Sequence, residues 1–320
     1  MGIITSDIGG KARGLYFLLA HARRLGYKVP KFLAVQNGFW DILSYTTIEV
    51  AKERRYREKL ITDIEPGKIA QIQKVRYIVN FNPRLAIRSS STLEDTINSP
   101  AAGIFKTKYY AFGKSNDFGA FRAVLLEVLN STYGRKANAY FRLMGYKNIP
   151  PLATVIQELV GKKWEFAPGW FFPLVSGVIN TADPDKIKIA TVYGFGHTAV
   201  KGYRTTSHVI DKKAIEHVSI PQTEFPFSTA LDQNNELHYD CAFLPNDLAL
   251  APTLHQRLAS IALELETAMG QALDIEWASP DGKEIYLLQC RPIKQNQVMP
   301  LIKLPHMLKN QHILYTDDFG

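Results

Sequence analysis

The chain has 320 residues, of which 46% are hydrophobic and 21% are charged. This composition is ordinary for a globular protein, and the length allows one large domain or two lobes with separate cores. No apolar run approaches the ~20 residues of a membrane span, and Met1–Asp7 lacks the basic and apolar regions of a signal peptide. Cys241 and Cys290 are too few for a disulfide framework. We therefore expect a cytoplasmic protein without membrane attachment.

The formal net charge of +8 fits an anionic ligand or partner. Lysine and arginine are dispersed along the chain, however, and Lys52–Lys59 is the one dense basic run. That run has the composition of a solvated helix face. We therefore predict an anionic ligand and no nucleic-acid partner.

Gly9-Gly10-Lys11 opens the first predicted helix. Backbone N–H groups and the helix dipole favour an anion at a helix N-terminus, so Lys11 is well placed to meet phosphate. The spacing is not that of a Walker A motif. The alternative is a flexible turn followed by an exposed lysine. Val29–Val35 is a predicted strand, and the following predicted helices resemble scaffold: Phe39–Tyr45, Ile48–Lys59 and Lys68–Val79.

Leu85–Ile87 reads as a short buried strand that ends in Arg88 and three serines. A charged residue at a strand end, followed by a hydroxyl-rich loop, is a common place for ligand contacts. Arg88 is therefore a candidate phosphate ligand. It is equally suited to pair with Glu94 or Asp95, and the two roles are compatible. A second strand, Ile104–Tyr110, contains Thr107.

Phe118–Leu129 and Arg135–Met144 are predicted amphipathic helices, and Ala153–Val160 is a predicted buried strand interrupted by Gln157 and Glu158. Buried polar groups need partners, and an adenine edge can bond to the backbone of such a segment. The alternative is an edge strand whose Gln157 and Glu158 face solvent.

Three further strands are predicted: Phe171–Asn180, Ile187–Tyr193 and Tyr203–Asp211. Gly194–Gly202 contains three glycines, which indicates a backbone that approaches another group closely. Ala214–Ala242 is polar and has turn signals, but it predicts no particular element. Ala251–Met269 is a predicted amphipathic helix, with one apolar stripe that consists of Leu254, Leu258, Ile261, Leu265 and Ala268.

Asp274–Ile293 predicts two strands joined by a turn at Asp281-Gly282. Because alternate residues of a strand share a face, Asp274 and Glu276 lie on one face, and Gln289 and Arg291 share a face of the return strand. Hard oxygen ligands suit Mg²⁺, and arginine suits phosphate oxygens. The hairpin therefore fits a magnesium–polyphosphate site. The alternative is an edge hairpin with a solvated acidic face.

Strands and helices alternate irregularly, which favours an α+β (mixed α/β) fold with two lobes. We predict a first lobe over residues 1–160 and a second lobe with the metal and phosphate hairpin over 161–298. Residues 299–320 are predicted to be a tail or a linker towards domains that this chain lacks.

Several of these motifs, in this order, resemble the nucleotide-binding domain of phosphoenolpyruvate synthase and pyruvate phosphate dikinase, which is an ATP-grasp-type domain. The resemblance extends from about Gly9 to Ile293. It is carried by Gly9–Lys11, Ala86–Ser90 with Glu94-Asp95, Ala102-Gly103 with Thr107, Val155–Gln157, Ser176–Val178 with Asp183-Pro184, Gly194–Gly196, Asp274–Trp277 and Gln289–Ile293.

The resemblance implies that ATP and Mg²⁺ bind between the two lobes. Lys11, Arg88 and Arg291 would contact the phosphates as the catalytic residues. Glu276 and Gln289 would ligate Mg²⁺.

Four further residues complete the implied ligand set. Asp274 would lie close to the metal ligands, and Thr107 would lie near the phosphates. Gln157 and Glu158 would lie at the adenine pocket.

In that family the β- and γ-phosphates pass together to a histidine on a separate swivelling domain. None of the 8 histidines here has a Gly/Thr/Ser-rich context, so we expect the carrier histidine on a domain or subunit absent from this chain. The chain would then be the ATP-binding part of a larger phosphotransferase.

The glycine-rich loop departs from the family's usual Gly-Leu-Gly-Glu, because Phe195 and His197 replace the leucine and the acid. A histidine cannot act as a carboxylate beside Mg²⁺. This departure leaves an alternative open, in which the chain is a non-catalytic nucleotide-sensing or regulatory module of a larger protein.

Overall fold

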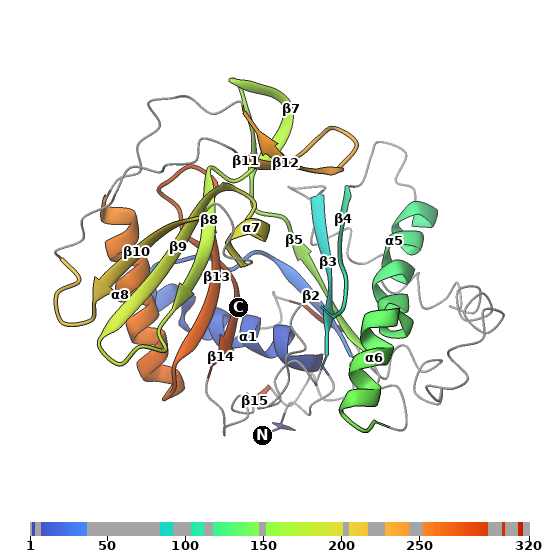
Figure 1. The fold of residues 1–320 in the computed structure, drawn as a ribbon, viewed down its shortest axis with the longest axis horizontal. Coiled ribbons are helices and arrows are strands. Elements are labelled where there is room, and N and C mark those ends of the chain that lie inside the picture. The colour runs from blue at the N-terminus through green and yellow to red at the C-terminus, as the bar shows by residue number, and fades with distance from the viewer. Residues whose placement is uncertain are drawn as a thin grey trace. The chain divides into compact units, whose positions relative to one another are not determined.

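The computed structural model of the chain (Figure 1) describes residues 2–3, 8–36, 84–91, 104–111, 118–146, 152–200, 205–216, 228–242, 252–293, 303–304 and 313–315. Its contacts divide the chain into two compact units. Unit 1 consists of Met1–Arg13, Lys31–Leu159 and Leu301–Gly320, and unit 2 consists of Gly14–Pro30 and Val160–Pro300. The three helices predicted between Phe39 and Val79 lie outside the described residues, as do Glu94, Asp95 and Ala101–Gly103.

Among the described residues of unit 1, five strands form an antiparallel sheet in the order β16-β2-β5-β3-β4. The strands are β2 (Phe32–Val35), β3 (Arg84–Ser90), β4 (Thr107–Ala111), β5 (Ala153–Glu158) and β16 (Ile313–Tyr315). A separate ladder pairs β1 (Gly2–Ile3) with β15 (Lys303–Leu304). Three helical segments follow β4, namely α5 (Phe118–Asn130), η5 (Ser131–Tyr133) and α6 (Arg135–Leu143).

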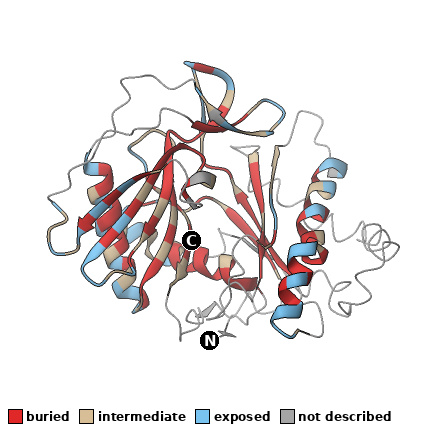
Figure 2. Cartoon of the chain, viewed as in Figure 1, coloured by how far each residue is buried: buried red, intermediate tan, exposed pale blue. Residues whose placement is uncertain are grey.

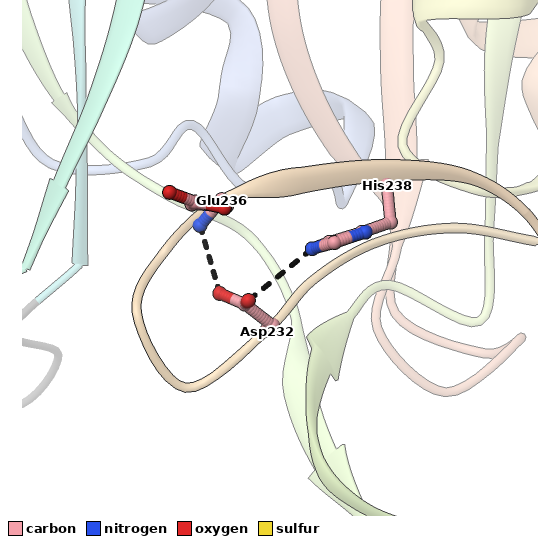
Figure 3. A group of neighbouring side chains, drawn as sticks. All are labelled: Asp232, Glu236 and His238. Carbon is pink, nitrogen blue, oxygen red and sulfur yellow. Dashed lines mark hydrogen bonds and ion pairs between the residues drawn. The ribbon is translucent and has the colours of Figure 1, made fainter.

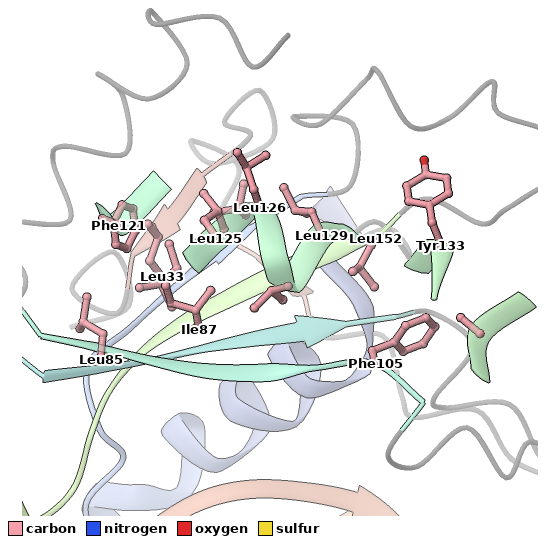
Figure 4. Close-up of a cluster of buried hydrophobic side chains, with 14 of the residues drawn as sticks. Leu33, Leu85, Ile87, Phe105, Phe121, Leu125, Leu126, Leu129, Tyr133 and Leu152 are labelled. Atoms are coloured by element: carbon pink, nitrogen blue, oxygen red, sulfur yellow. The ribbon is translucent and has the colours of Figure 1, made fainter. Parts of the chain in front are cut away.

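The core of unit 1 lies between this sheet and α5 (Figure 4). Phe121, Leu125 and Leu129 recur at helical spacing on α5 and are buried against Leu85 and Ile87 of β3. The helix is thus held by one apolar face, as its sequence pattern predicts.

Strand β5 is flanked by β2 and β3, so it is an interior strand of the sheet. Gln157 is only 3% exposed, while Glu158 is half-buried. The alternative of an edge strand with a solvent-facing Gln157 is therefore wrong, because β5 is paired on both sides and the Gln157 side chain is buried.

Nine strands form the sheet of unit 2 within the described residues, with the main order β14-β13-β8-β9-β11-β7-β6. Strand β10 pairs with β9, and β12 pairs with β11. The bounds are β6 (Lys162–Trp164), β7 (Ala167–Phe172), β8 (Val175–Asn180), β9 (Lys186–Gly194), β10 (Thr206–Asp211), β11 (Ser228–Leu231), β12 (Leu237–Cys241), β13 (Leu273–Ser279) and β14 (Tyr286–Pro292).

Helix α8 (Pro252–Met269) packs against β8, β9 and β13. Figure 2 shows its buried face towards the sheet and its exposed face towards solvent. The predicted stripe is confirmed for Leu254, Leu258, Ile261 and Leu265, but Ala268 is exposed and Met269 is buried instead. Helix α1 (Gly9–Leu25) begins in unit 1 and continues in unit 2, and α7 is the short helix His197–Val200.

Three stretches differ from the sequence interpretation. The strand predicted over Phe171–Asn180 is two strands, because Pro173 has no N–H to donate to a ladder. The uninformative stretch Ala214–Ala242 contains the β11–β12 hairpin. Within the predicted tail, β16 joins the sheet of unit 1 by pairing with β2.

Candidate functional site

The first turn of α1 and the end of β3 are joined by hydrogen bonds. The Gly10 N–H donates to the Ser91 carbonyl at 3.2 Å, and the Ala12 N–H donates to the Ser90 hydroxyl at 3.2 Å. The Ser90 hydroxyl donates in turn to the Ile8 carbonyl at 2.7 Å. Two N–H groups that the sequence interpretation left available to an anion are therefore already bonded within unit 1. Lys11 is the residue between Gly10 and Ala12 in the chain, and its side chain is half-buried.

Arg88 lies on β3, opposite Thr107 of β4 and Val155 of β5. Its Nη1 donates to the Gln157 Oε1 at 3.0 Å. Within unit 1 the sheet therefore brings together Arg88, Thr107 and Gln157, of which Thr107 is exposed. The alternative pairing of Arg88 with Glu94 or Asp95 falls on residues outside the described ranges.

The end of β5 was predicted to offer backbone groups to adenine. The Glu158 N–H donates to the Lys31 carbonyl at 2.8 Å, and the Leu159 N–H donates to the Arg84 carbonyl at 3.0 Å. Both N–H groups are thus occupied. Burial raises the pKa of the Glu158 carboxyl, although the Lys31 backbone and charge oppose the rise.

In unit 2 the predicted hairpin is confirmed, since β13 pairs antiparallel with β14. Asp274 lies opposite Arg291, and Glu276 lies opposite Gln289. A register shift follows Glu276, so that Trp277 lies opposite Leu287. The pairing places the two acids, the amide and the guanidinium at the same end of the hairpin, at the end distant from the Asp281-Gly282 turn.

Asp274 and Arg291 form an ion pair, in which Arg291 Nε donates to Asp274 Oδ2 at 2.7 Å and Nη2 donates to the same oxygen. The Asp274 side chain is 17% exposed and that of Arg291 is 38% exposed. Burial raises the pKa of Asp274, the charge and hydrogen bonds of Arg291 lower it, and Glu276 raises it further. The carboxylate therefore fixes the orientation of the guanidinium.

Glu276 and Gln289 provide a carboxylate and an amide oxygen on facing strands. Glu276 is half-buried, and Gln289 is 6% exposed. Two hard oxygen donors at neighbouring positions are the chemistry that Mg²⁺ prefers. The side chains present on this hairpin thus fit a magnesium ion.

The glycine-rich turn approaches β11 of its own sheet. Gly194 has φ +73°, and a Cβ on it would lie 2.1 Å from the Thr229 carbonyl oxygen. The Phe195 N–H donates to that oxygen at 2.8 Å, and the Ser176 hydroxyl donates to the Gly194 carbonyl. The need for glycine at position 194 is therefore explained by packing within unit 2. His197 follows as the first residue of α7.

Figure 3 shows a cluster that the sequence interpretation missed, at the turn between β11 and β12. Asp232 Oδ1 accepts the N–H groups of Asn234 at 2.8 Å and Glu236 at 2.9 Å, and Oδ2 lies 3.2 Å from His238 Nε2. The ligand atoms of Asp232, Glu236 and His238 lie within 4.8 Å of one another. Asp232 caps the turn by these contacts, and the Asp-Gln-Asn-Asn sequence is a turn signal that would have located the hairpin.

The predicted site residues divide between the units. Lys11, Arg88, Thr107, Gln157 and Glu158 lie in unit 1. The remaining predicted residues, which lie in unit 2, are Asp274, Glu276, Gln289 and Arg291. Each set is assembled by the hydrogen bonds and strand pairing of its own unit.

Comparison with known proteins identifies the family. The family model described as "Pyruvate phosphate dikinase, AMP/ATP-binding domain" matches residues 5–309. The chain is 27% identical to a probable phosphoenolpyruvate synthase of Methanocaldococcus jannaschii over 224 residues, which cover 65% of this chain and 17% of that protein. It is 26% identical to the prodigiosin synthesizing transferase PigC of Serratia marcescens over 309 residues, which cover 89% of this chain and 31% of that protein.

Among solved structures, D-alanyl-alanine synthetase A of Vibrio cholerae aligns with a TM-score of 0.34 at 8% identity, over 88% of this chain and 55% of that chain. The matched part of the chain covers 17% of the length of the Methanocaldococcus jannaschii protein and 31% of the length of PigC, which is less than a third of each. None of the helices in the described ranges is long and apolar enough to cross a membrane. The match over residues 5–309 confirms the resemblance seen in the sequence, and the chain belongs to the family of pyruvate phosphate dikinase AMP/ATP-binding domains.

Proposed function

We propose that this chain is the ATP-binding domain of a phosphoenolpyruvate synthase- or dikinase-like phosphotransferase. It binds Mg·ATP, and the β- and γ-phosphates pass together to a histidine on a separate domain or subunit. The family match supports ATP as the ligand. The greater length of the relatives, of which the chain covers 17% and 31%, supports a carrier domain outside this chain.

The hairpin register carries this proposal. The pairing of Asp274 with Arg291 and of Glu276 with Gln289 puts a guanidinium directly beside two hard oxygen donors. Phosphoryl transfer depends mainly on positioning and charge neutralisation. A phosphate-binding cation beside a magnesium-binding pair meets both demands.

Each side chain then has a role. Arg291 contacts phosphate oxygens, and Asp274 holds its guanidinium in place through the ion pair. Glu276 and Gln289 hold Mg²⁺, which neutralises phosphate charge when bound.

In unit 1, Lys11 and Arg88 contribute the remaining positive charge. Gln157 orients Arg88 through the 3.0 Å hydrogen bond. Thr107, opposite Arg88 on β4, lies beside the phosphates, and Gln157 and Glu158 border the adenine pocket.

Arg291→Ala and Glu276→Ala test this assignment by titration with Mg·ATP. Removal of one partner from a charge-assisted contact costs about 2–5 kcal/mol, so we expect affinity losses of roughly 30-fold or more. Glu284→Ala is the matched control, because Glu284 lies beside the turn of the same hairpin and its exposed side chain pairs with Lys28 at the surface. Affinities equal to that of the control in both variants would refute the site assignment.

The second candidate function is a nucleotide-sensing module, and His197 favours it. The residue is half-buried at the start of α7, where the family pattern has an acid. If the loop has drifted from a catalytic form, His197→Glu in the full-length protein raises the rate at which AMP is formed from ATP. An unchanged rate, with binding of ATP intact, counts against such drift.

A further inference from the structure

One buried hydroxyl connects two segments that carry candidate phosphate-binding residues. Ser90 is 0% exposed and is the last residue of β3. Its Oγ donates to the Ile8 carbonyl at 2.7 Å and accepts the Ala12 N–H at 3.2 Å. The hydroxyl therefore bonds to the backbone on both sides of Lys11.

The backbones of the two segments also meet directly. The Gly10 N–H donates to the Ser91 carbonyl at 3.2 Å. Gly9 has φ +69°, and a Cβ on it would lie 2.0 Å from the Ser90 carbonyl oxygen and 2.7 Å from the Ser90 Oγ. Only glycine permits this approach, because it lacks a Cβ and tolerates positive φ. Gly9 thus lets the start of α1 contact the end of β3.

The contact fixes the backbone of Lys11 relative to that of Arg88. Gly10 and Ala12, the neighbours of Lys11, are both bonded to the end of β3. Arg88 lies two residues before Ser90 on the same strand, where ladders to β4 and β5 hold its register. All of these residues belong to unit 1.

We propose that Ser90 is a positioning residue for the triphosphate, whose hydroxyl sets the position of Lys11 relative to Arg88. Ser90 does not touch the ligand, because its hydroxyl is buried and already donates and accepts within the protein. The inference rests on the proposed function, since Lys11 and Arg88 enter it as phosphate-binding residues.

Ser90→Ala in the full chain tests the proposal, with Ser89→Ala as the matched control. Ser89 is adjacent and 1% exposed, and its hydroxyl has no hydrogen-bond partner among the described residues. Residues within one hydrogen-bond network are commonly coupled in their effects. We expect Ser90→Ala to weaken ATP binding about tenfold, and Ser89→Ala to bind ATP like the wild type.

A comparison of the affinities for ATP and for adenosine distinguishes a positioning role of Ser90 from a general loss of structure. If Ser90 acts on the phosphate-binding residues, Ser90→Ala lowers the affinity for ATP and leaves the affinity for adenosine unchanged. Equal losses for both ligands would indicate a merely structural role and would overturn the proposal.

A double-mutant cycle with Lys11→Met tests whether Ser90 acts through Lys11. In the Lys11→Met background the Ser90→Ala substitution should change ATP affinity by less than about twofold. A full tenfold loss in that background would refute the coupling.

The outcomes distinguish this inference from the proposed function. Absence of ATP binding by the wild-type chain overturns both. Wild-type binding with equal affinities in Ser90→Ala and Ser89→Ala overturns the positioning role alone. If Ser90→Ala does not fold, Ser90→Cys replaces it, because a thiol has similar volume and forms weaker hydrogen bonds. We then expect Ser90→Cys to lose affinity for ATP and to keep its affinity for adenosine.

Discussion

A buried pair of histidines in unit 2 predicts a loss of stability in acid. His255 of α8 is 0% exposed, and its Nε2 lies 3.0 Å from the Thr191 hydroxyl of β9. His208 of β10 is 3% exposed, and the centroids of the two rings are 4.2 Å apart. The centroid of the buried Trp277 ring lies 6.4 Å from that of His255. Two imidazoles are thus packed together in a layer without solvent.

No carboxylate on the described strands of this layer faces the pair. On β10 and β13, Asp211, Asp274 and Glu276 alternate with buried residues, so they lie on the sheet face opposite α8. The lysines of β9, Lys186 and Lys188, are exposed on that opposite face as well. Among the described strands, a protonated imidazole here would find no opposite charge to stabilise it.

Helix α8 itself carries Arg257, Glu264 and Glu266. The side chains of Arg257 and Glu264 are exposed. Glu266 is half-buried and pairs with Lys212. The charges of the helix therefore also lie outside the histidine layer.

Burial, and secondarily the charge of His208, lowers the pKa of His255 from 6.5 to about 4. Burial also lowers the pKa of His208. The unfolded chain therefore binds a proton at higher pH than the folded chain, so the stabilising contribution is complete above pH ~6.5 and is lost as pH falls towards 4. One pKa unit corresponds to about 1.4 kcal/mol. His255 alone should then reduce the free energy of unfolding by about 3 kcal/mol at pH 4.

Denaturant unfolding at pH 7.5 and at pH 4 measures this loss. His255→Leu removes the titrating ring from the layer, so the variant should lose about 3 kcal/mol less than the wild type between the two pH values. His21→Leu is the control for the loss of a histidine side chain, since His21 lies on α1 and is half-buried. Equal pH dependence in wild type and His255→Leu would refute the reasoning.

Two pairs of variants test packing and electrostatics in unit 2, and the free energy of unfolding is measured for each variant. Gly194 and Gly270 both have positive φ, at +73° and +71°, but a Cβ would clash only at Gly194. Gly194→Ala should therefore cost at least about 2 kcal/mol more than Gly270→Ala, and equal costs would contradict the packing account. The ion pair of Lys212 with Glu266 is largely buried, since the two side chains are 12% and 19% exposed. The ion pair of Arg24 with Glu264 lies at the surface, where the two side chains are 58% and 52% exposed. Lys212→Met should cost about 2 kcal/mol and Arg24→Met less than about 1; the reverse order would show that burial does not set the strength of these pairs.

The sequence was sufficient to predict the secondary-structure elements that depend only on residues close together in the chain. The Asp281-Gly282 turn and the alternation of Asp274 and Glu276 were sufficient to locate the hairpin and the faces of its strands. The apolar spacing of α8 was sufficient to identify its buried side, apart from Ala268 at the end. Short-range periodicity and turn chemistry determine both features.

Features that depend on distant partners were not predictable in the same way. The Ser90 hydroxyl bonds to Ala12 across 78 positions in the sequence and to Ile8 across 82. His255 meets Thr191 across 64 positions. The sequence marked Ser90 as a polar residue at a strand end and gave no sign that its hydroxyl is buried. Only the packed structure shows which polar groups satisfy one another.

The proposed function requires the chain to bind Mg·ATP. Calorimetric titration of the purified chain with a non-hydrolysable ATP analogue, with and without Mg²⁺, tests it most directly. We expect binding that depends on Mg²⁺ and that is weakened by Glu276→Ala but not by Glu284→Ala. Binding that is equally strong without Mg²⁺, or that is unchanged in Glu276→Ala, would contradict the assignment of the hairpin as the metal site. Absence of binding with and without Mg²⁺ would contradict the proposed function itself.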